Sequence, residues 1–316
     1  MNKRQLGKTG IEVAPLCFGG NVFGWTIDQE MSFQLLDGFV EAGFNFVDTA
    51  DVYSRWVPGN KGGESETIIG NWMKERRIRD KVIIATKVGM ELAPDKKGLK
   101  AAYIKQAVED SLKRLQTDYI DLYQSHTDDM ETPIEETLAA FDALVKEGKV
   151  RAIGASNFSA KRLKESLHIS EQQDFASYVT LQPKYNLHDR ESFEKELEPL
   201  CLNKEVSVIP YYSLASGFLT GKYRSKDDIK QSARGEKAIS YLDERGVKIL
   251  GALDDISLDH QVKPATIALA WLMQRPSITA PIASATSLEQ LKDLTEAAQI
   301  KLATVEVEKL DFESRY

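Results

Sequence analysis

The fold is decided by the stretch Gly43-Phe44-Asn45-Phe46-Val47-Asp48-Thr49-Ala50-Asp51-Val52-Tyr53. Its apolar centre, Phe46-Val47, has the composition of a short strand, because strand interiors favour β-branched and aromatic residues. The strand ends abruptly in a carboxylate, Asp48, and Tyr53 follows shortly after it. An acid at this point indicates that the strand delivers a functional group at its carboxyl end.

Two later segments repeat the pattern of an apolar strand that ends in an ionisable residue. Residues 82–86, Val-Ile-Ile-Ala-Thr, run directly into Lys87, and residues 119–125, Tyr-Ile-Asp-Leu-Tyr-Gln-Ser, run into His126. Three strands that each carry such a group at the same end predict one active site, which the fold assembles from distant parts of the sequence.

The composition excludes several classes of protein. The chain of 316 residues is 42% hydrophobic and 28% charged, as is usual for a globular protein, and its length fits one α/β barrel domain. A formal net charge of −7 without a basic cluster argues against nucleic-acid binding. No apolar run approaches the roughly 20 residues that span a bilayer, and the amino terminus lacks the apolar region of a secretory signal.

The cysteine content agrees with a cytoplasmic location. Only Cys17 and Cys201 occur, so neither a disulfide framework nor a cysteine-based metal site is indicated. We therefore expect a cytoplasmic protein with no metal, no membrane segment and no nucleic-acid partner.

Strand and helix patterns alternate along the chain after a predicted hairpin over residues 4–13. Strands are expected at residues 15–20, 46–48, 82–86, 120–124, 150–155, 178–182, 206–210 and 278–281. Helices are expected at residues 30–42, 64–74, 99–115, 134–147, 160–166, 192–203, 237–257, 264–274 and 288–298. Strands separated by helices pair in parallel through crossover connections.

Eight such units predict an α/β fold, a (β/α)8 TIM barrel with an N-terminal β-hairpin cap, formed by residues 1–316 as a single domain. The main rival is an open doubly wound sheet, which carries a Gly-rich phosphate-binding turn after its first strand. The segment Gly19-Gly20-Asn21-Val22-Phe23-Gly24 is only loosely related to that turn, so we interpret it as a barrel loop.

The four ionisable residues support one chemistry. In a barrel the carboxyl ends of neighbouring strands bring Asp48, Tyr53, Lys87 and His126 together. An ammonium group beside a tyrosine lowers its pKa, and a carboxylate keeps that ammonium charged and oriented. The tyrosine then acts as a general acid toward a carbonyl oxygen, while the histidine donates a hydrogen bond to the same oxygen.

The sequence resembles the aldo-keto reductase family over nearly its whole length. Besides residues 43–53, 84–87 and 120–126, the matching motifs are Gly63-Glu64-Ser65-Glu66, Lys149-Val150-Arg151-Ala152-Ile153-Gly154-Ala155-Ser156-Asn157-Phe158, Gln182-Pro183-Lys184-Tyr185-Asn186-Leu187 and Gly217-Phe218-Leu219-Thr220-Gly221-Lys222-Tyr223. Their order and spacing together are highly specific.

The resemblance implies NAD(P)H-dependent reduction of an aldehyde or ketone to an alcohol. It makes Tyr53 the proton donor, Lys87 the neighbour that lowers its pKa, Asp48 the partner of Lys87, and His126 the residue that orients the carbonyl. All four positions carry the residue type that the family requires, so the resemblance implies an active enzyme.

The resemblance also implies a nicotinamide cofactor. Ser156, Asn157 and Gln182 match positions that hold the carboxamide, and Tyr211 matches the aromatic residue that stacks on the nicotinamide ring. Residues 214–222 resemble the loop over the pyrophosphate, and residues 284–293 resemble the adenosine end. The cofactor positions are Gly20, Asn21, Asp48, Ser156, Asn157, Gln182, Tyr211, Ser213, Leu214, Ser216, Gly217, Leu219, Gly221, Lys222, Arg224, Ser284, Thr286, Gln290 and Asp293.

Two positions depart from the family pattern. Many members have Arg or Lys where this chain has Thr286, so the charge-assisted contact to the 2′-phosphate is absent there. Lys222 and Arg224 are candidates to replace it, and NADP(H) is favoured with NAD(H) as the alternative. After the seventh strand the chain reads Pro210-Tyr211-Tyr212-Ser213-Leu214 in place of a Pro-Tyr-Ser-Pro-like segment.

Three alternatives stay open at this stage. Trp25 and Trp56 lie in loops on the catalytic face, where they either form the substrate pocket or pack beneath the loops. The reaction could instead be that of a Schiff-base aldolase with Lys87 as the nucleophile, although an aldolase has no use for a nucleotide cleft. A third hypothesis is a non-catalytic nicotinamide-binding regulatory subunit. Neither the small carbonyl substrate nor the oligomeric state can be read from the sequence.

Overall fold

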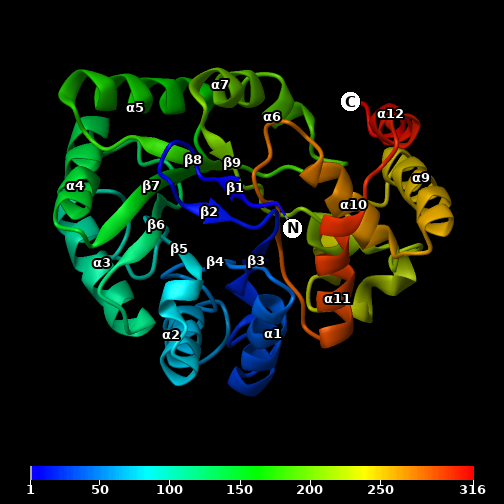
Figure 1. Cartoon of the computed structure of the whole chain (residues 1–316), viewed down its shortest axis with the longest axis horizontal. Helices are drawn as coiled ribbons and strands as arrows, with labels where there is room; N and C mark the ends of the chain where they lie inside the picture. Colours follow the sequence, from blue (N-terminus) through cyan, green and yellow to red (C-terminus); the bar gives the residue numbers. More distant parts are fainter. Residues whose placement is uncertain (1) are drawn as a thin grey trace.

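Eight parallel strands form the centre of the molecule, and helices cover their outer side (Figure 1). The computed structural model describes residues 2–316. In spatial order the strands are β10 (Ile282–Ala283), β3 (Cys17–Gly19), β4 (Phe46–Asp48), β5 (Ile83–Val88), β6 (Ile120–Ser125), β7 (Val150–Ser156), β8 (Tyr178–Gln182) and β9 (Ser207–Val208).

The two edges of this sheet meet and close it. The backbone N–H of Thr279 donates to the carbonyl of Val208 at 2.8 Å, and that of Ile282 donates to the carbonyl of Pro210 at 2.9 Å. These bonds join the chain around β10 to the chain around β9. The predicted (β/α)8 barrel is therefore confirmed.

Helices form the outer layer and return the chain to the start of the next strand. They are α1 (Gln29–Glu41), α2 (Glu64–Arg76), α3 (Ala101–Leu115), α4 (Ile134–Lys146), α5 (Ala160–Gln173), α6 (Glu191–Glu194), α7 (Leu197–Lys204), α8 (Gly235–Ile239), α9 (Glu244–His260), α10 (Pro264–Met273), α11 (Leu288–Glu296) and α12 (Thr304–Glu313). The first begins where Asp28 accepts a hydrogen bond from the N–H of Met31 at 2.9 Å, which caps the free end of the helix.

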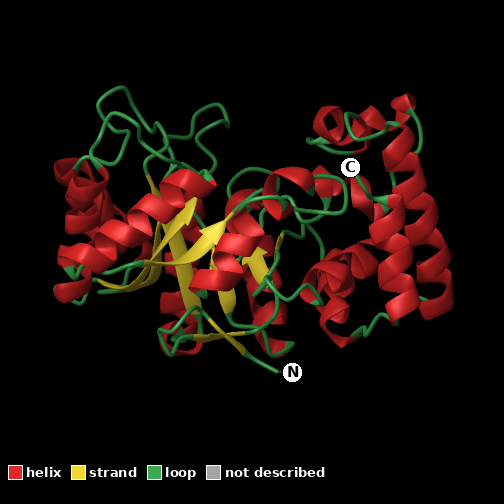
Figure 2. Ribbon diagram, turned by 90° about the horizontal axis from the view of Figure 1, so that it is seen from above, coloured by secondary structure: helices red, strands yellow, loops and turns green. Residues whose placement is uncertain are grey.

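An antiparallel hairpin, β1 (Arg4–Gln5) and β2 (Glu12–Val13), closes the amino-terminal end of the barrel, near the N label in Figure 2. Its apolar residues Leu6 and Val13 are fully buried and pack with Phe46 and other inward-facing strand residues. The predicted hairpin cap is confirmed, and the carboxyl ends of the strands form the mouth at the other end of the barrel.

Several predicted elements differ from the structure. The helix expected at residues 160–166 continues to Gln173, and the strand expected at residues 206–210 is limited to Ser207–Val208. The helix expected at residues 192–203 is interrupted at Glu196, and Pro199 lies in the first turn of α7, where its missing N–H is tolerated. The helix expected at residues 237–257 is split, because Asp243 caps α9 by accepting from the N–H of Gly246 at 2.6 Å. The last strand lies at 282–283 and not at 278–281, since residues 278 and 279 bond to Val208 instead.

Among residues 2–316, no helix combines the length and the apolar character needed to cross a membrane. Cys17 and Cys201 are both buried free thiols.

Candidate active site

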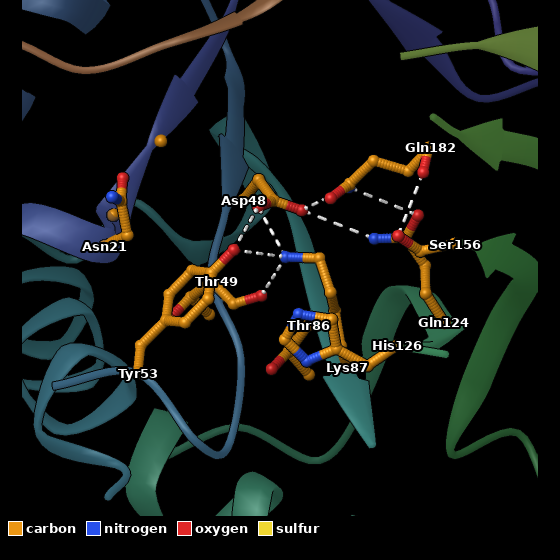
Figure 3. A network of polar contacts seen from close by, with 12 residues as sticks. Asn21, Asp48, Thr49, Tyr53, Thr86, Lys87, Gln124, His126, Ser156 and Gln182 are labelled. Carbon is orange, nitrogen blue, oxygen red and sulfur yellow. Dashed lines mark hydrogen bonds and ion pairs between the residues drawn. The ribbon is translucent and has the colours of Figure 1, made fainter. Parts of the chain in front are cut away.

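The four ionisable residues singled out in the sequence meet at the mouth of the barrel (Figure 3). Asp48 ends β4, Lys87 lies near the end of β5, and His126 directly follows β6. These three strands are neighbours in the sheet, so their carboxyl ends open on the same space. Tyr53 lies in the loop after β4, and its ring points back toward Lys87.

Lys87 is fully buried and all three of its ammonium donors have partners. Its Nζ lies 2.6 Å from Oδ2 of Asp48, 2.8 Å from the carbonyl oxygen of Thr49 and 2.9 Å from Oη of Tyr53. Burial acts to lower the pKa of Lys87, but Asp48 and Tyr53 outweigh it and raise that pKa above its ordinary value. The lysine is therefore a fixed positive charge beside the phenol.

The acidity of Tyr53 is the outcome of opposing effects. Burial raises the pKa of Tyr53 to about 12, Lys87 acts in the opposite direction, and Asp48 adds to the increase. The expected net lowering of this pKa is therefore wrong, because desolvation of the phenolate exceeds the stabilisation that the single ammonium gives. Tyr53 is a neutral phenol at physiological pH.

Two glutamines hold the second oxygen of Asp48. The side-chain amide of Gln182, at the end of β8, donates to Oδ1 at 2.9 Å, and that of Gln124, on β6, donates at 3.3 Å. Sequence reasoning missed Gln124. The period-two alternation of β6 places it on the same inner face as His126, and that signal would have found it.

His126 stands next to Tyr53, with the two ring centroids 5.9 Å apart. Burial, with Lys87 as a second cause, holds the pKa of His126 well below its ordinary value, so the imidazole is neutral. Its Nδ1 is buried and has no hydrogen-bond partner among residues 2–316. A neutral imidazole carries one N–H, which can be directed at an oxygen in the mouth.

A second group of predicted residues lies beside the first. Asn157, in the loop after β7, donates to the carbonyl of His126 at 2.9 Å and accepts from the hydroxyl of Tyr211 at 2.7 Å. Ser156 donates to the carbonyl of Gln182 at 2.9 Å. A cavity of about 170 Å³ adjoins this group, and its lining includes Asn157, Pro183 and Tyr211.

The loop after β9 contains a hydroxyl group without a partner. In the short 3-10 helix η3 (Ala215–Thr220), Ser216 and Gly217 adopt left-handed backbone angles, with φ of 59° and 96°. The Oγ of Ser216 is buried and has no hydrogen-bond partner within the described part of the chain. Ser213, in the same loop, instead donates to the carbonyl of Pro210 at 3.1 Å. A free hydroxyl in a twisted backbone segment fits an anionic ligand.

The residues predicted to bind the adenosine end of the cofactor lie at the carboxyl ends of β3 and β10. Ser284 lies 2.7 Å from both the carbonyl of Gly19 and Oδ1 of Asn21. The N–H of Thr286 donates to Oε1 of Gln290 at 2.9 Å, and Ser287 caps α11. The predicted residues Asn21, Ser284, Thr286 and Gln290 are therefore neighbours.

The two cations proposed to replace a charge at position 286 differ in their surroundings. Arg224 pairs with Asp254 of α9 through two contacts of 2.7 and 2.8 Å, so its charge is already compensated. Lys222 is exposed and has no carboxylate partner in residues 2–316. Of the two, Lys222 is the one available to a ligand.

The two loop tryptophans form an aromatic wall beside Tyr53. The rings of Trp25 and Trp56 meet edge to face with centroids 5.5 Å apart, and Trp56 lies 6.1 Å from Tyr53. Trp56 is 49% exposed, so one of its faces remains open toward solvent. The wall packs against the ring of Tyr53 through Trp56.

Comparisons with known proteins agree with this geometry. The sequence model of the aldo/keto reductase family matches residues 15–312. The uncharacterized oxidoreductase YrpG of Bacillus subtilis is 36% identical over 96% of this chain and 92% of its own length. A probable voltage-gated potassium channel subunit beta of Oryza sativa is 33% identical, over 97% of this chain and 94% of its own. The aldo-keto reductase AFTS1 of Alternaria alternata is also 33% identical, over 95% of this chain and 88% of its own length.

Proposed function

The chain belongs to the aldo/keto reductase family of oxidoreductases, and from this premise we propose that it reduces an aldehyde or ketone to an alcohol with NADPH. The observation that carries the proposal is the contact of 2.9 Å between the buried ammonium of Lys87 and the hydroxyl of Tyr53. The same mouth contains both a proton donor and the residues suited to a dinucleotide.

The cofactor would lie across the mouth from the loop after β7 to the start of α11. When bound, a reduced nicotinamide supplies a hydride to the carbonyl carbon. Ser156, Asn157 and Tyr211 would hold the nicotinamide end, and residues 213–222 would surround the pyrophosphate. The unpartnered hydroxyl of Ser216 supports this placement, because a phosphate oxygen would accept its hydrogen bond.

Tyr53 supplies the proton. As the substrate oxygen gains negative charge it becomes an alkoxide, which is a much stronger base than a phenolate. A phenol with a pKa of about 12 is still acidic enough to protonate that oxygen. Lys87 stabilises the phenolate that remains, and Asp48 keeps Lys87 in place.

His126 positions the substrate. Because its imidazole is neutral, it offers one N–H to the carbonyl oxygen without competing with Tyr53 as an acid. Its ring lies edge to face against that of Tyr53, so one substrate oxygen between the two rings would accept from both donors.

The alternative reading as a Schiff-base aldolase is less well supported. A lysine nucleophile must be neutral, whereas the pKa of Lys87 is raised by Asp48 and Tyr53 against the effect of burial. All three donors of its ammonium are also occupied by Asp48, Thr49 and Tyr53.

Similarity to a potassium channel beta subunit favours a second candidate, a nicotinamide-binding regulatory subunit. Such a protein would bind the cofactor and turn over slowly or not at all. The intact set of Asp48, Tyr53, Lys87 and His126 favours catalysis.

The test is consumption of NADPH, and of NADH in parallel, against a panel of aldehydes and ketones. We expect turnover with several aldehydes, and Tyr53→Phe should bind NADPH normally while losing about 10²- to 10⁴-fold in kcat. Reduction by Tyr53→Phe at the rate of the natural chain would refute the assigned role. Tight NADPH binding without turnover on any carbonyl would favour the regulatory subunit.

A further inference from the structure

Helices α9 and α12 pack side by side and run in opposite directions at the outer edge of the molecule (Figure 1). Near the end of α9, His260 lies 2.8 Å from Glu306 in the first turn of α12. Further back along α9, Asp255 pairs with Lys309 at 2.6 Å. The start of α9 and the end of α12 line a cavity of about 400 Å³, to which Phe312 contributes. The outer sides of the two helices therefore form one surface.

This surface exposes four large apolar side chains. Val247 and Leu258 of α9 and Val305 and Phe312 of α12 are between 57% and 79% exposed. Positions 247 and 258, like positions 305 and 312, are separated by nearly whole numbers of helical turns, so each pair lies on one side of its helix. Because the helices are antiparallel, Leu258 and Val305 lie at one end of the surface, and Val247 and Phe312 lie at the other. Exposed apolar side chains gathered in this way mark an interaction surface.

The charges without partners differ between the two ends. At the end that contains Leu258, Asp259 and Glu308 are exposed and make no ion pair with any residue from 2 to 316. At the other end, Arg245 contacts a histidine ring nitrogen and Arg315 a backbone carbonyl, and neither has a carboxylate partner in the described chain. One end thus offers free acids, and the other offers free guanidinium groups.

The acids at the arginine end do not cancel this difference. Asp243 caps α9 by accepting from the N–H of Gly246, and Glu244 pairs with Lys248 at 2.7 Å. Of the acids that line the cavity, Glu313 alone makes no ion pair within the part of the chain that the structure describes. One free acid therefore stands against two free arginines.

A glycine in the middle of α9 has no explanation within a single chain. Gly251 is exposed and lies between Val247 and Leu258 along the same side of the helix, and a Cβ atom added to it would meet nothing within 4 Å. The other glycine inside α9, Gly246, lies against the carbonyl of Tyr241, where a Cβ would clash. Glycine weakens a helix interior, and its use is the close approach of another group to the backbone. At Gly251 that group is absent from the chain itself.

We propose that this surface pairs with the same surface of a second copy of the chain, about a twofold axis near Gly251. Such an axis brings opposite ends of two identical surfaces together. Leu258 and Val305 of one copy then meet Val247 and Phe312 of the other, and the free acids meet the free arginines. An unlike partner would not require the two ends of this surface to complement each other. The inference is independent of the proposed reaction, since none of these residues belongs to the site at the mouth.

Sedimentation velocity of the natural chain over a range of micromolar concentrations is the first test. We expect a species of twice the 35.4 kDa of the single chain. A mass of one chain at every concentration would overturn the inference, whatever the catalytic activity of the preparation.

Leu258→Asp places the interface on this surface. It should raise the dimer Kd about 100-fold, tenfold for each of the two equivalent contacts in a twofold dimer. Leu202→Asp is the matched control, because Leu202 is a half-exposed leucine of α7, outside the surface, and this variant should dimerise like the natural chain. A dimer that survives Leu258→Asp unchanged would lie on another face and would overturn the inference.

Charge reversal tests the pairing of opposite ends. Glu308→Arg and Arg315→Glu should each raise the dimer Kd at least about tenfold, because each places like charges against each other across the axis. The double variant restores opposite charges and should dimerise nearly as well as the natural chain. A double variant weaker than either single one would show that these ends do not meet.

Gly251→Gln tests the position of the axis in a variant whose fold is not at risk, since the added side chain meets nothing within 4 Å in one chain. Its thermal unfolding as a monomer should match or exceed that of the natural chain, whereas its dimer Kd should rise at least about tenfold. An unchanged dimer Kd would exclude a close helix contact at Gly251 and refute the proposed arrangement.

Discussion

The side-chain amide of Gln182 donates a hydrogen bond of 2.9 Å to Oδ1 of Asp48, from a residue 134 positions away in the sequence. Gln124 donates to the same oxygen at 3.3 Å, and Lys87 takes the other oxygen at 2.6 Å. Asp48 is therefore held from both sides, and the direction of the Lys87 ammonium toward Tyr53 depends on the two glutamines as well as on the acid.

Gln124→Leu should lower kcat about tenfold without changing the Kd for NADPH, because one charged hydrogen bond to Asp48 is lost and the carboxylate is free to turn. Steady-state kinetics and cofactor titration check this. The control is Gln106→Leu, which removes an exposed amide of α3 that donates to Asp110. Full activity in Gln124→Leu would show that Asp48 needs no second anchor.

Lys87→Met should lower the free energy of unfolding by about 3–5 kcal/mol, since it leaves the buried carboxylate of Asp48 unpaired. Adding Asp48→Asn should restore most of that stability but none of the activity. Urea denaturation of the two variants measures the difference. An equally unstable double variant would mean that packing of the Lys87 side chain, and not its charge, stabilises the fold.

The oxidation of alcohols should become faster as the pH rises. In this direction Tyr53 must act as a phenolate, and because its pKa is about 12, the phenolate fraction grows about tenfold per pH unit up to that value. We expect kcat for alcohol oxidation to keep rising between pH 6 and 10, while carbonyl reduction changes little. A plateau near pH 7 would indicate that cofactor binding lowers the pKa of Tyr53 far more than the protein alone does.

Asp51 should make the fold less stable as the pH rises from about 4 to about 8. Its two oxygens are buried without partners among residues 2–316, and burial, with Glu66 as a second cause, raises its pKa to about 8. Between its unfolded pKa of about 3.9 and this value the folded state binds more protons than the unfolded state, so stability falls as the pH rises.

Asp51→Asn should remove this dependence. Its stability relative to the natural chain should grow by up to about 1.4 kcal/mol per pH unit between pH 4 and 8. Denaturation at several pH values checks the slope. If the difference in unfolding free energy between the two chains did not change with pH, a bound water or ion would be stabilising the charged form of Asp51.

Lys222→Gln should weaken NADPH binding about 10- to 100-fold and leave NADH binding nearly unchanged, because only the 2′-phosphate would need the charge. Arg224→Gln serves as the comparison, since Asp254 already occupies that guanidinium. Fluorescence titration with both cofactors measures the effect. Equal losses for NADPH and NADH would place Lys222 on the pyrophosphate.

Local sequence patterns were sufficient to predict most strands and helices of the barrel. The strands at residues 46–48 and 178–182 were predicted with the bounds that the structure has, because short apolar runs between helical patterns have few other interpretations. The helix around residues 192–203 was misjudged, since the apolar period continues through Glu196, where the backbone leaves the helix. Closure of the barrel depends on hydrogen bonds between Val208 and Thr279, which lie far apart in the sequence, so no local pattern predicts them.

The order of strands and helices, and the identity of the four residues at the mouth, follow from the primary structure, because strand ends and family motifs are local properties of the chain. The acidity of Tyr53 and the hydrogen bond from Gln124 to Asp48 arise only in the folded barrel. Each of these depends on which groups surround a side chain and how much water they exclude, and both are set by segments that meet only when the barrel closes.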